Sequence, residues 1–139
     1  MLIVLFFCAF SSFSQIEPYD LKLEYRTNPE GVDVLKPRFF WKINSKESGQ
    51  FQSAYQLVVS TSEEKLAQNI GDAYDSGKVK SSETTQITYK GKSLKPASQY
   101  FWKVKTWGKN NTPSWSKTAK FSTGLLEKED WKDAQWIAW

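Results

Sequence analysis

Hydrophobic and polar residues alternate with a period of two in several short stretches between residues 17 and 124. Turn-forming residues such as Gly, Pro, Asn and Asp separate these stretches, and none keeps a 3.6-residue period for more than about two turns. A period of two places successive side chains on opposite faces of a strand. The pattern therefore predicts an antiparallel all-β protein in which most strands bury one face.

Seven strands are predicted at this spacing, and the run from 99 to 107 is the longest. They cover residues 21–26, 38–43, 55–59, 73–75, 85–89, 99–107 and 118–123. Seven short antiparallel strands with turns between them are typical of a β-sandwich of the fibronectin type III or immunoglobulin-like kind. Residues 61–69 predict a short helical turn capped by Thr61 or Ser62.

The alternation also predicts which side chains enter the core. In the first strand the inward set comprises Leu21, Leu23 and Tyr25. Trp41 in the second strand and Trp102 in the longest strand are expected to anchor the core, since each lies on the apolar face of its strand.

Residues 1–14 (MLIVLFFCAFSSFS) have the pattern of a secretory signal peptide. The apolar run from 2 to 10 is shorter than the roughly 20 residues that span a bilayer, so no membrane span is predicted. Ser12 and Ser14 suit signal peptidase, which predicts cleavage before Gln15 and a secreted or periplasmic location. Lipidation of Cys8, giving a surface lipoprotein, is the less favoured alternative because Phe7 is too large for that processing site.

The composition changes after Gly124 to LLEKEDWKDAQWIAW, which is charged and rich in Trp. Apolar residues gathered in such a segment usually need a surface to cover them. We therefore expect residues 15–124 to form the sandwich and residues 125–139 to form a linker and the start of a following β-domain. The alternative is that this tail folds back onto its own sandwich.

Charge and side-chain chemistry exclude several function classes. The 19 basic and 15 acidic residues give a net charge of +4 and are interspersed, which does not favour a nucleic-acid partner. The sequence has no His, and its one Cys lies in the leader, so catalytic triads and Cys/His zinc sites are excluded. No glycine-rich phosphate loop is present. We predict no catalytic residue, no metal ligand and no cofactor.

Two sets of close carboxylates are candidates for glycoside hydrolysis, which uses a pair of carboxyl groups. Glu63 and Glu64 lie in the predicted helical turn and are expected to face solvent. Asp72 and Asp75 flank a turn, where Asp commonly bonds to local backbone. The structural interpretation is favoured for all four.

Aromatic and apolar side chains expected at the surface have two candidate roles. Stacking on sugar rings is predicted for Phe40, Phe101 and Trp107. Docking against another domain is predicted for Trp115, Trp131, Trp136 and Ile137. Interfaces between domains use the same exposed aromatic residues. Docking is favoured over sugar binding, because the tail after Gly124 is expected to lead into another domain.

Residues 21–41 (LKLEYRTNPEGVDVLKPRFFW) resemble the opening of bacterial multi-domain α-L-rhamnosidases. The residues that carry the resemblance are Glu24, Tyr25, Asn28, Pro29, Gly31, Asp33, Pro37, Arg38 and Trp41. Further similar segments follow in the same order, namely QSAYQLVVS at 52–60, YDSGKV at 74–79, YFWKVKTW at 100–107 and the tail from 124 to 137. The chain departs from the family at Gly108, where Asp is frequent, and at Ala138, where Gly is usual.

The resemblance implies the N-terminal fibronectin-III-like domain of an enzyme that removes terminal α-L-rhamnose with inversion. In that family the catalytic carboxylates lie on a helical barrel downstream, and this sequence contains none of it. The expected function is a non-catalytic accessory module whose partners are the downstream domains of the same polypeptide, with rhamnose-containing glycans as a further candidate. The alternatives are an independent carbohydrate-binding module and a cell-surface adhesion domain.

Overall fold

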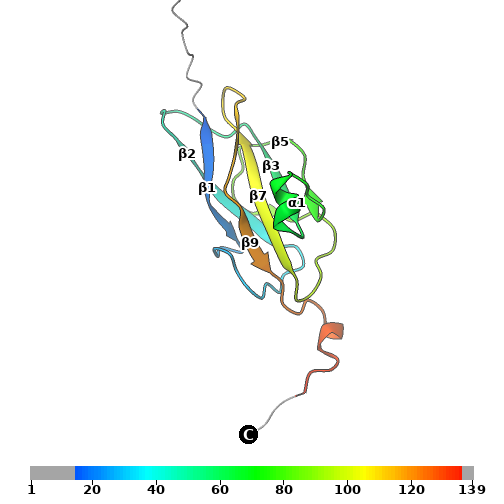
Figure 1. Cartoon of the computed structure of the whole chain (residues 1–139). Helices are drawn as coiled ribbons and strands as arrows, with labels where there is room; N and C mark the ends of the chain where they lie inside the picture. The colour runs from blue at the N-terminus through cyan, green and yellow to red at the C-terminus, as the bar shows by residue number, and fades with distance from the viewer. Residues whose placement is uncertain (1–14, 136–139) are drawn as a thin grey trace, which may run out of the picture.

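The computed structural model describes residues 15–135, which form two antiparallel β-sheets packed face to face (Figure 1). The smaller sheet has the order β1-β2-β6 and consists of β1 (Ile16–Leu23), β2 (Arg38–Ser45) and β6 (Ile87–Thr88). The predicted leader, residues 1–14, lies outside the described residues, as do residues 136–139.

The larger sheet is built around the pairing of two long strands, β3 (Ala54–Ser60) and β7 (Gln99–Trp107). Its other strands are β4 (Tyr74–Asp75), β5 (Val79–Lys80), β8 (Pro113–Trp115) and β9 (Ala119–Ser122). β4 and β5 both pair with the free edge of β3, and β8 and β9 both pair with the free edge of β7. The nine strands in residues 15–135 therefore fill seven strand positions, three in one sheet and four in the other, which confirms the predicted sandwich.

A serine bridges each of the two interrupted edges. Between β4 and β5, the N–H of Ser76 donates to the carbonyl of Leu57 (3.0 Å), and the N–H of Leu57 donates to Ser76 Oγ (2.8 Å). Between β8 and β9, Ser116 makes the same two bonds to Val104, at 2.8 Å and 3.0 Å. Leu57 and Val104 are fully buried and directly paired. Each serine hydroxyl thus supplies the acceptor that a continuous edge strand would provide through its backbone.

Large aromatic side chains fill the space between the sheets. Trp41 is 2% exposed and Trp102 is 1% exposed, which confirms both as core residues. The ring of Phe39 meets Trp102 edge-on with centroids 4.7 Å apart, a favourable aromatic geometry. The indole N–H of Trp41 donates to the buried amide oxygen of Gln52 (2.8 Å), so its polar atom is satisfied.

A tyrosine near the start of β7 fixes the chain before it. The hydroxyl oxygen of Tyr100 accepts a hydrogen bond from the backbone N–H of Lys95 (2.9 Å), and its ring stacks on Phe121. Such a backward bond from a tyrosine at this place is typical of immunoglobulin-like sandwiches.

The strand β3 is buried on both faces, which period-two alternation alone does not predict. The helix α1 (Glu63–Ala67) lies beside β3 and β7 in Figure 1, and its Leu66 is fully buried. Val58 and Ser60, on the face away from Leu57, are also fully buried. Ser62 caps α1, because its side chain accepts a hydrogen bond from the N–H of Lys65 (3.3 Å). Of the two caps predicted, Thr61 and Ser62, the structure therefore uses Ser62.

The prediction for the first strand is partly wrong. Leu23 is fully buried as expected, but β1 ends there, because Glu24 and Tyr25 adopt positive φ angles of 47° and 65°. The chain turns at these two residues, and Tyr25 is 58% exposed instead of facing the core. Hydrophobic periodicity cannot detect a turn when the residues of the turn fit the same alternating pattern as the strand.

Replacing either bridging serine by alanine is expected to lower the free energy of unfolding by about 1–3 kcal/mol, since a buried backbone N–H would lose its acceptor. Urea denaturation of Ser76→Ala and Ser116→Ala measures this effect. Ser82→Ala is the matched control, because Ser82 is exposed, and its effect should stay within about 0.5 kcal/mol. Losses no larger than that of the control would contradict the bridging role.

Candidate functional site

Glu24 and Arg38, which belong to the family motif at residues 21–41, form an ion pair that links the end of β1 to the start of β2. Arg38 Nη2 lies 2.7 Å from Glu24 Oε2, and Arg38 Nε and the Arg38 backbone N–H donate to Oε1 at 3.1 Å and 2.7 Å. The Glu24 side chain is only 13% exposed. Its hydrogen bonds from Arg38 lower the pKa of the Glu24 carboxyl, although partial burial opposes them. This carboxylate is committed to structure.

The next part of the motif ties the loop after β1 to the edge of β9. Asn28 Oδ1 accepts from the N–H of Lys120 (3.0 Å), and the N–H of Gly31 donates to Ser122 Oγ (3.2 Å). The N–H of Val32 donates to the carbonyl of Ser122 (2.8 Å). Gly31 has φ of +65°, a conformation that costs glycine little. The motif therefore joins the two sheets along one side of the sandwich.

The four carboxylates that were candidates for hydrolysis make local hydrogen bonds or face solvent. Glu63 and Glu64 are exposed in the first turn of α1. Asp72 is partly buried, which alone would raise its pKa, but hydrogen bonds from Lys65 and Thr61 outweigh burial and hold the pKa well below its usual range. Asp75 accepts from Gln56 Nε2 and from the N–H of Gly77. None of the four borders the grooves described below.

Of the three residues predicted to stack on sugar rings, Trp107 is least accessible. It lies on the outer face of the larger sheet, but it is only 9% exposed, so the expectation of an exposed ring is wrong. Side chains of Lys78 and Lys105 lie over its ring and cover it. Phe40 and Phe101 are half-buried. Sugar stacking by Phe40 and Phe101 stays a prediction.

Phe40 has an aromatic neighbour that the sequence pattern had placed in the core. The ring of Tyr25 lies 4.5 Å from that of Phe40, and the guanidinium of Arg38 lies 5.3 Å from the Tyr25 ring. A hollow of about 300 Å³ borders both rings on the outer face of the smaller sheet. Asp20, which also borders it, is ion-paired with Lys42 (2.8 Å).

Lysine and tryptophan side chains alternate across the outer face of the larger sheet. The Nζ of Lys103 lies 4.5 Å from the ring centroid of Trp115, and Lys105 Nζ lies 5.3 Å from Trp115 and 5.1 Å from Trp107. Lys78 Nζ lies 4.5 Å from the Trp107 centroid. We call these five residues the lysine–tryptophan ladder. The run Lys103-x-Lys105-x-Trp107 on one strand was the sequence signal for it, which analysis of single side chains missed.

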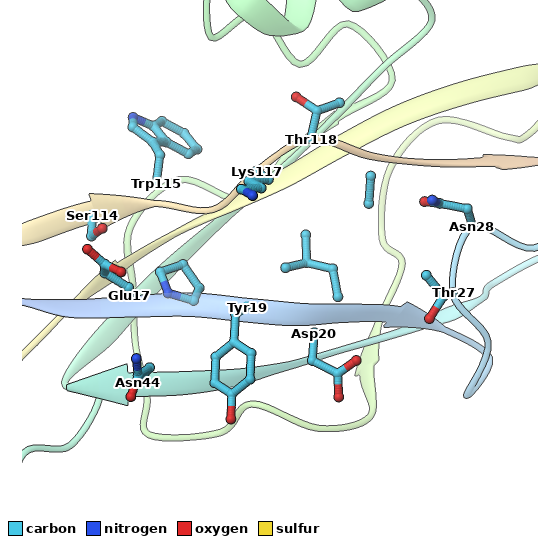
Figure 2. A pocket seen from close by; sticks show the side chains of 13 residues that line it. Glu17, Tyr19, Asp20, Thr27, Asn28, Asn44, Ser114, Trp115, Lys117 and Thr118 are labelled. Atoms are coloured by element: carbon cyan, nitrogen blue, oxygen red, sulfur yellow. The ribbon is translucent and has the colours of Figure 1, made fainter.

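A groove of about 700 Å³ runs between β1 and the β8–β9 edge (Figure 2). Figure 2 shows Trp115 and Tyr19 pointing away from each other, from the two strands that border the groove. A clamp for a flat ring would require two aromatic rings that face each other across the groove, and Trp115 and Tyr19 do not (Figure 2). The residues that line the groove include the apolar residues Pro18, Leu21 and Ala119.

The residues predicted to dock against another domain fall into three environments. Trp115 is half-buried within the lysine–tryptophan ladder. Trp131, in the 3₁₀ helix η1 (Lys128–Trp131), is 58% exposed. Trp136 and Ile137 lie outside the described residues.

An apolar surface that the sequence analysis missed is bordered by the start of the C-terminal segment. Figure 1 shows this segment leaving the sandwich at one end. Leu35 is 52% exposed and borders a groove of about 510 Å³ together with Leu94 and Leu126. Val34, its neighbour in the loop before β2, is 38% exposed. Two adjacent apolar residues in a loop that otherwise carries charge and Pro were the available signal. Val34 and Trp131 do not line the groove but are adjacent in the sequence to Leu35 and Asp130, which do. We call Val34, Leu35, Leu126 and Trp131 the apolar end.

Neither a metal site nor a membrane helix emerges from residues 15–135. No group of three or more His, Cys, Asp or Glu side chains there could hold a metal ion. No helix in the same range is long and apolar enough to cross a bilayer.

The two packed sheets, the aromatic core and the bond from Lys95 to Tyr100 define an immunoglobulin-like β-sandwich domain. Residues 18–127 match the family described as "Rha78A-like, N-terminal immunoglobulin domain", and the chain belongs to this family. The resemblance seen in the sequence is thereby confirmed.

Related proteins and structures carry the name α-L-rhamnosidase. The enzyme of Alteromonas sp. is 44% identical over 99% of this chain, and one from Formosa agariphila is 41% identical over 83%. The solved α-L-rhamnosidase of Dictyoglumus thermophilum superposes with a TM-score of 0.81 at 47% identity over 84% of this chain. That of Streptomyces avermitilis, complexed with L-rhamnose, gives 0.79 at 34% over 85%. The chain spans between 11% and 15% of the length of these four proteins.

The ion pair of Glu24 and Arg38 predicts a specific dependence of stability on pH. Because the folded state lowers the pKa of Glu24 below 4.5, its contribution is present above that pH and is lost as the pH falls through the folded pKa. Glu24→Gln is expected to cost about 1–2 kcal/mol at pH 7 and much less at pH 3. Urea midpoints at both pH values measure the difference.

The control for this prediction is Glu30→Gln, because Glu30 is exposed. Its effect on stability should be small at both pH values. If Glu24→Gln lowers the free energy of unfolding equally at pH 7 and pH 3, the charge of the Glu24 carboxylate does not stabilise the fold through its ion pair with Arg38.

Proposed function

We propose that this chain is a non-catalytic N-terminal accessory domain of an α-L-rhamnosidase that packs against the domain following it in the polypeptide. The observation that carries the proposal is the apolar end, which lies where the chain leaves the sandwich. The small share of the related enzymes that the chain covers supports the same assignment.

Energetics favour a protein partner at this surface. Trp131 and Leu35 are both more than half exposed, and burying apolar surface contributes about 25 cal/mol per Å². A following domain is tethered beside this surface, which gives it a high effective concentration there. Interfaces between domains of one chain commonly bury about 600–1,500 Å².

The first part of the tail supports this proposal. Leu126 packs against the sandwich core, whereas Trp131 stays exposed. Asp130 fixes the turn between them by accepting hydrogen bonds from the N–H groups of Leu126 (2.8 Å) and Glu127 (2.9 Å). The tail is thus held at the apolar end and presents Trp131 outward.

The chemistry of the chain supports a non-catalytic role. The sequence lacks His, and the carboxylates of Glu24, Asp72 and Asp75 are held in local hydrogen bonds. Residues elsewhere in the polypeptide would carry the hydrolysis of α-L-rhamnosides. A secreted or periplasmic location, expected from the leader, belongs to the same proposal.

Sugar binding is the second candidate function. The hollow beside Tyr25 and Phe40 favours it, because exposed aromatic rings at a concave surface can stack on a sugar. The apolar end carries more exposed apolar surface than this hollow, so docking remains the preferred function.

A domain exchange tests docking. Residues 15–135 would replace the N-terminal domain of the Dictyoglumus thermophilum enzyme, and the melting temperature would be compared with that of the enzyme lacking this domain. The exchange is expected to raise the melting temperature above that of the truncated enzyme, because the apolar end becomes covered. Leu35→Asp in the exchanged enzyme should remove most of the gain by placing a charge in the interface.

Two controls separate docking from folding. Leu35→Asp should leave the melting of the isolated chain nearly unchanged, because Leu35 is exposed there. Ile70→Asp changes a residue of similar exposure, 46%, beside α1, and should keep the gain in the exchanged enzyme. Equal losses for the two variants, or no gain from the exchange, would count against docking through the apolar end.

A further inference from the structure

The register of the larger sheet gathers lysines that are dispersed in the sequence. Lys103 and Lys105 point outward on β7, because the alternate residues Trp102 and Val104 are buried in the core. Directly paired residues on neighbouring strands point to the same face. Lys80 pairs with Ala54 beside Trp107, and Lys120 pairs with Phe101, so both join this face. Together with Lys78 of the ladder, the lysine face consists of Lys78, Lys80, Lys103, Lys105 and Lys120.

Carboxylates do not neutralise the lysine face. In residues 15–135 the ion pairs involve Lys22, Arg38, Lys42 and Lys65, and none of the five face lysines. Asp75 lies on the same face through its pairing with Val58, but its carboxylate accepts from Gln56 and Gly77. Burial lowers the pKa of the Lys103 ammonium, the direction expected of a cation that no carboxylate compensates. The face therefore holds a concentrated positive charge.

The ladder determines what kind of ligand this face can recognise. Lysine ammonium groups lie over the rings of Trp107 and Trp115, so those ring faces are taken. Neutral sugars and unpaired bases both bind proteins largely by stacking on free aromatic faces. The ammonium group of Lys78 also donates to Asn111 Oδ1 (2.8 Å). None of the ladder lysines in the described residues is paired with a carboxylate, so their charge can still attract anions. Recognition here rests on charge.

We propose that the lysine face binds an anionic polysaccharide through its carboxylate or sulfate groups. Outward residues on one strand are roughly 7 Å apart and neighbouring strands are roughly 5 Å apart, so the cations form an array that an extended charged chain can follow. The helix α1 borders this array, because it packs on β3 and β7 where Val58 and Ser60 are buried. The choice of a polysaccharide over another polyanion rests on the proposed function as part of a glycoside hydrolase. The site differs in place and chemistry from the apolar end and from the hollow beside Phe40.

Isothermal titration of the 139-residue chain at low ionic strength tests the proposal with matched polymers. Dextran sulfate and polygalacturonate are the sulfated and carboxylated probes, and neutral dextran is the uncharged counterpart. Binding of at least one charged probe is expected, with no binding of dextran. Raising the salt from 50 to 200 mM should weaken binding about tenfold or more, because surface charge interactions are screened.

Two variants locate the site. Lys80→Gln with Lys120→Gln removes two exposed cations outside the ladder and should weaken binding at least fivefold without changing the melting temperature. Lys90→Gln with Lys92→Gln removes the same charge from an exposed turn after β6 and should change binding less than twofold. Lys105→Gln, with circular dichroism to check folding, tests the ladder itself and should also weaken binding.

The outcomes separate this proposal from its rivals and from the docking function. Binding of neither charged probe, or equal weakening by both pairs of variants, would overturn it. Tighter binding of poly(dT) than of either polysaccharide, with the same lysine dependence, would overturn the assignment to a polysaccharide. None of these results bears on docking, which the domain exchange tests at a different surface.

Discussion

The pairing of β3 with β7 is the interaction on which the other strands depend. Its central pair, Leu57 and Val104, is fully buried, and each residue has its outer backbone groups satisfied by a serine on an interrupted edge strand. A buried backbone N–H group that lacks an acceptor lowers the stability of the fold by about as much as a lost hydrogen bond. Ser76 and Ser116 therefore allow both edge strands to be interrupted, because the backbone N–H groups of Leu57 and Val104 still have acceptors.

The interrupted edges also position the surfaces for which functions are proposed. The break after β8 lets Trp115 lie beside Lys103 and Lys105, while β9 continues with Ala119 and Phe121 in the core. On the same edge, the loop from 28 to 32 bonds to β9 and joins the smaller sheet to the larger one. Motif residues that mark the family, such as Asn28, thus serve as connections within the fold rather than as chemistry.

Sequence periodicity predicted the strands best where a strand is long and buries one face. The run 99–107 is β7 from end to end, and Phe39 and Trp41 face the core as the alternation requires. Periodicity failed at Tyr25, where positive φ angles turn the chain, and at Val58, which α1 and its flanking loop cover. Both errors depend on contacts between segments distant in sequence or on backbone conformation, which hydrophobic spacing does not encode.

The candidate surfaces were less predictable than the fold, for a related reason. Trp131 is exposed, and its docking role stays a prediction, whereas Leu35 in the apolar end gave only a weak signal in the sequence. The lysine face could not be read from the chain, because pairing between strands creates it: Lys80 and Lys120 become neighbours of β3 and β7 only through the register. Interspersed charge in a sequence does not imply interspersed charge on a sheet.

The central claim is that the charged residues of this chain stabilise the β-sandwich or lie on its surface, and that they do not catalyse hydrolysis. Its most direct test is the release of nitrophenol from a 4-nitrophenyl α-L-rhamnoside by the purified 139-residue chain, with the Alteromonas sp. α-L-rhamnosidase as the positive control. The account predicts a rate equal to that of buffer from pH 4 to pH 8. Saturable turnover that co-elutes with the chain would contradict it.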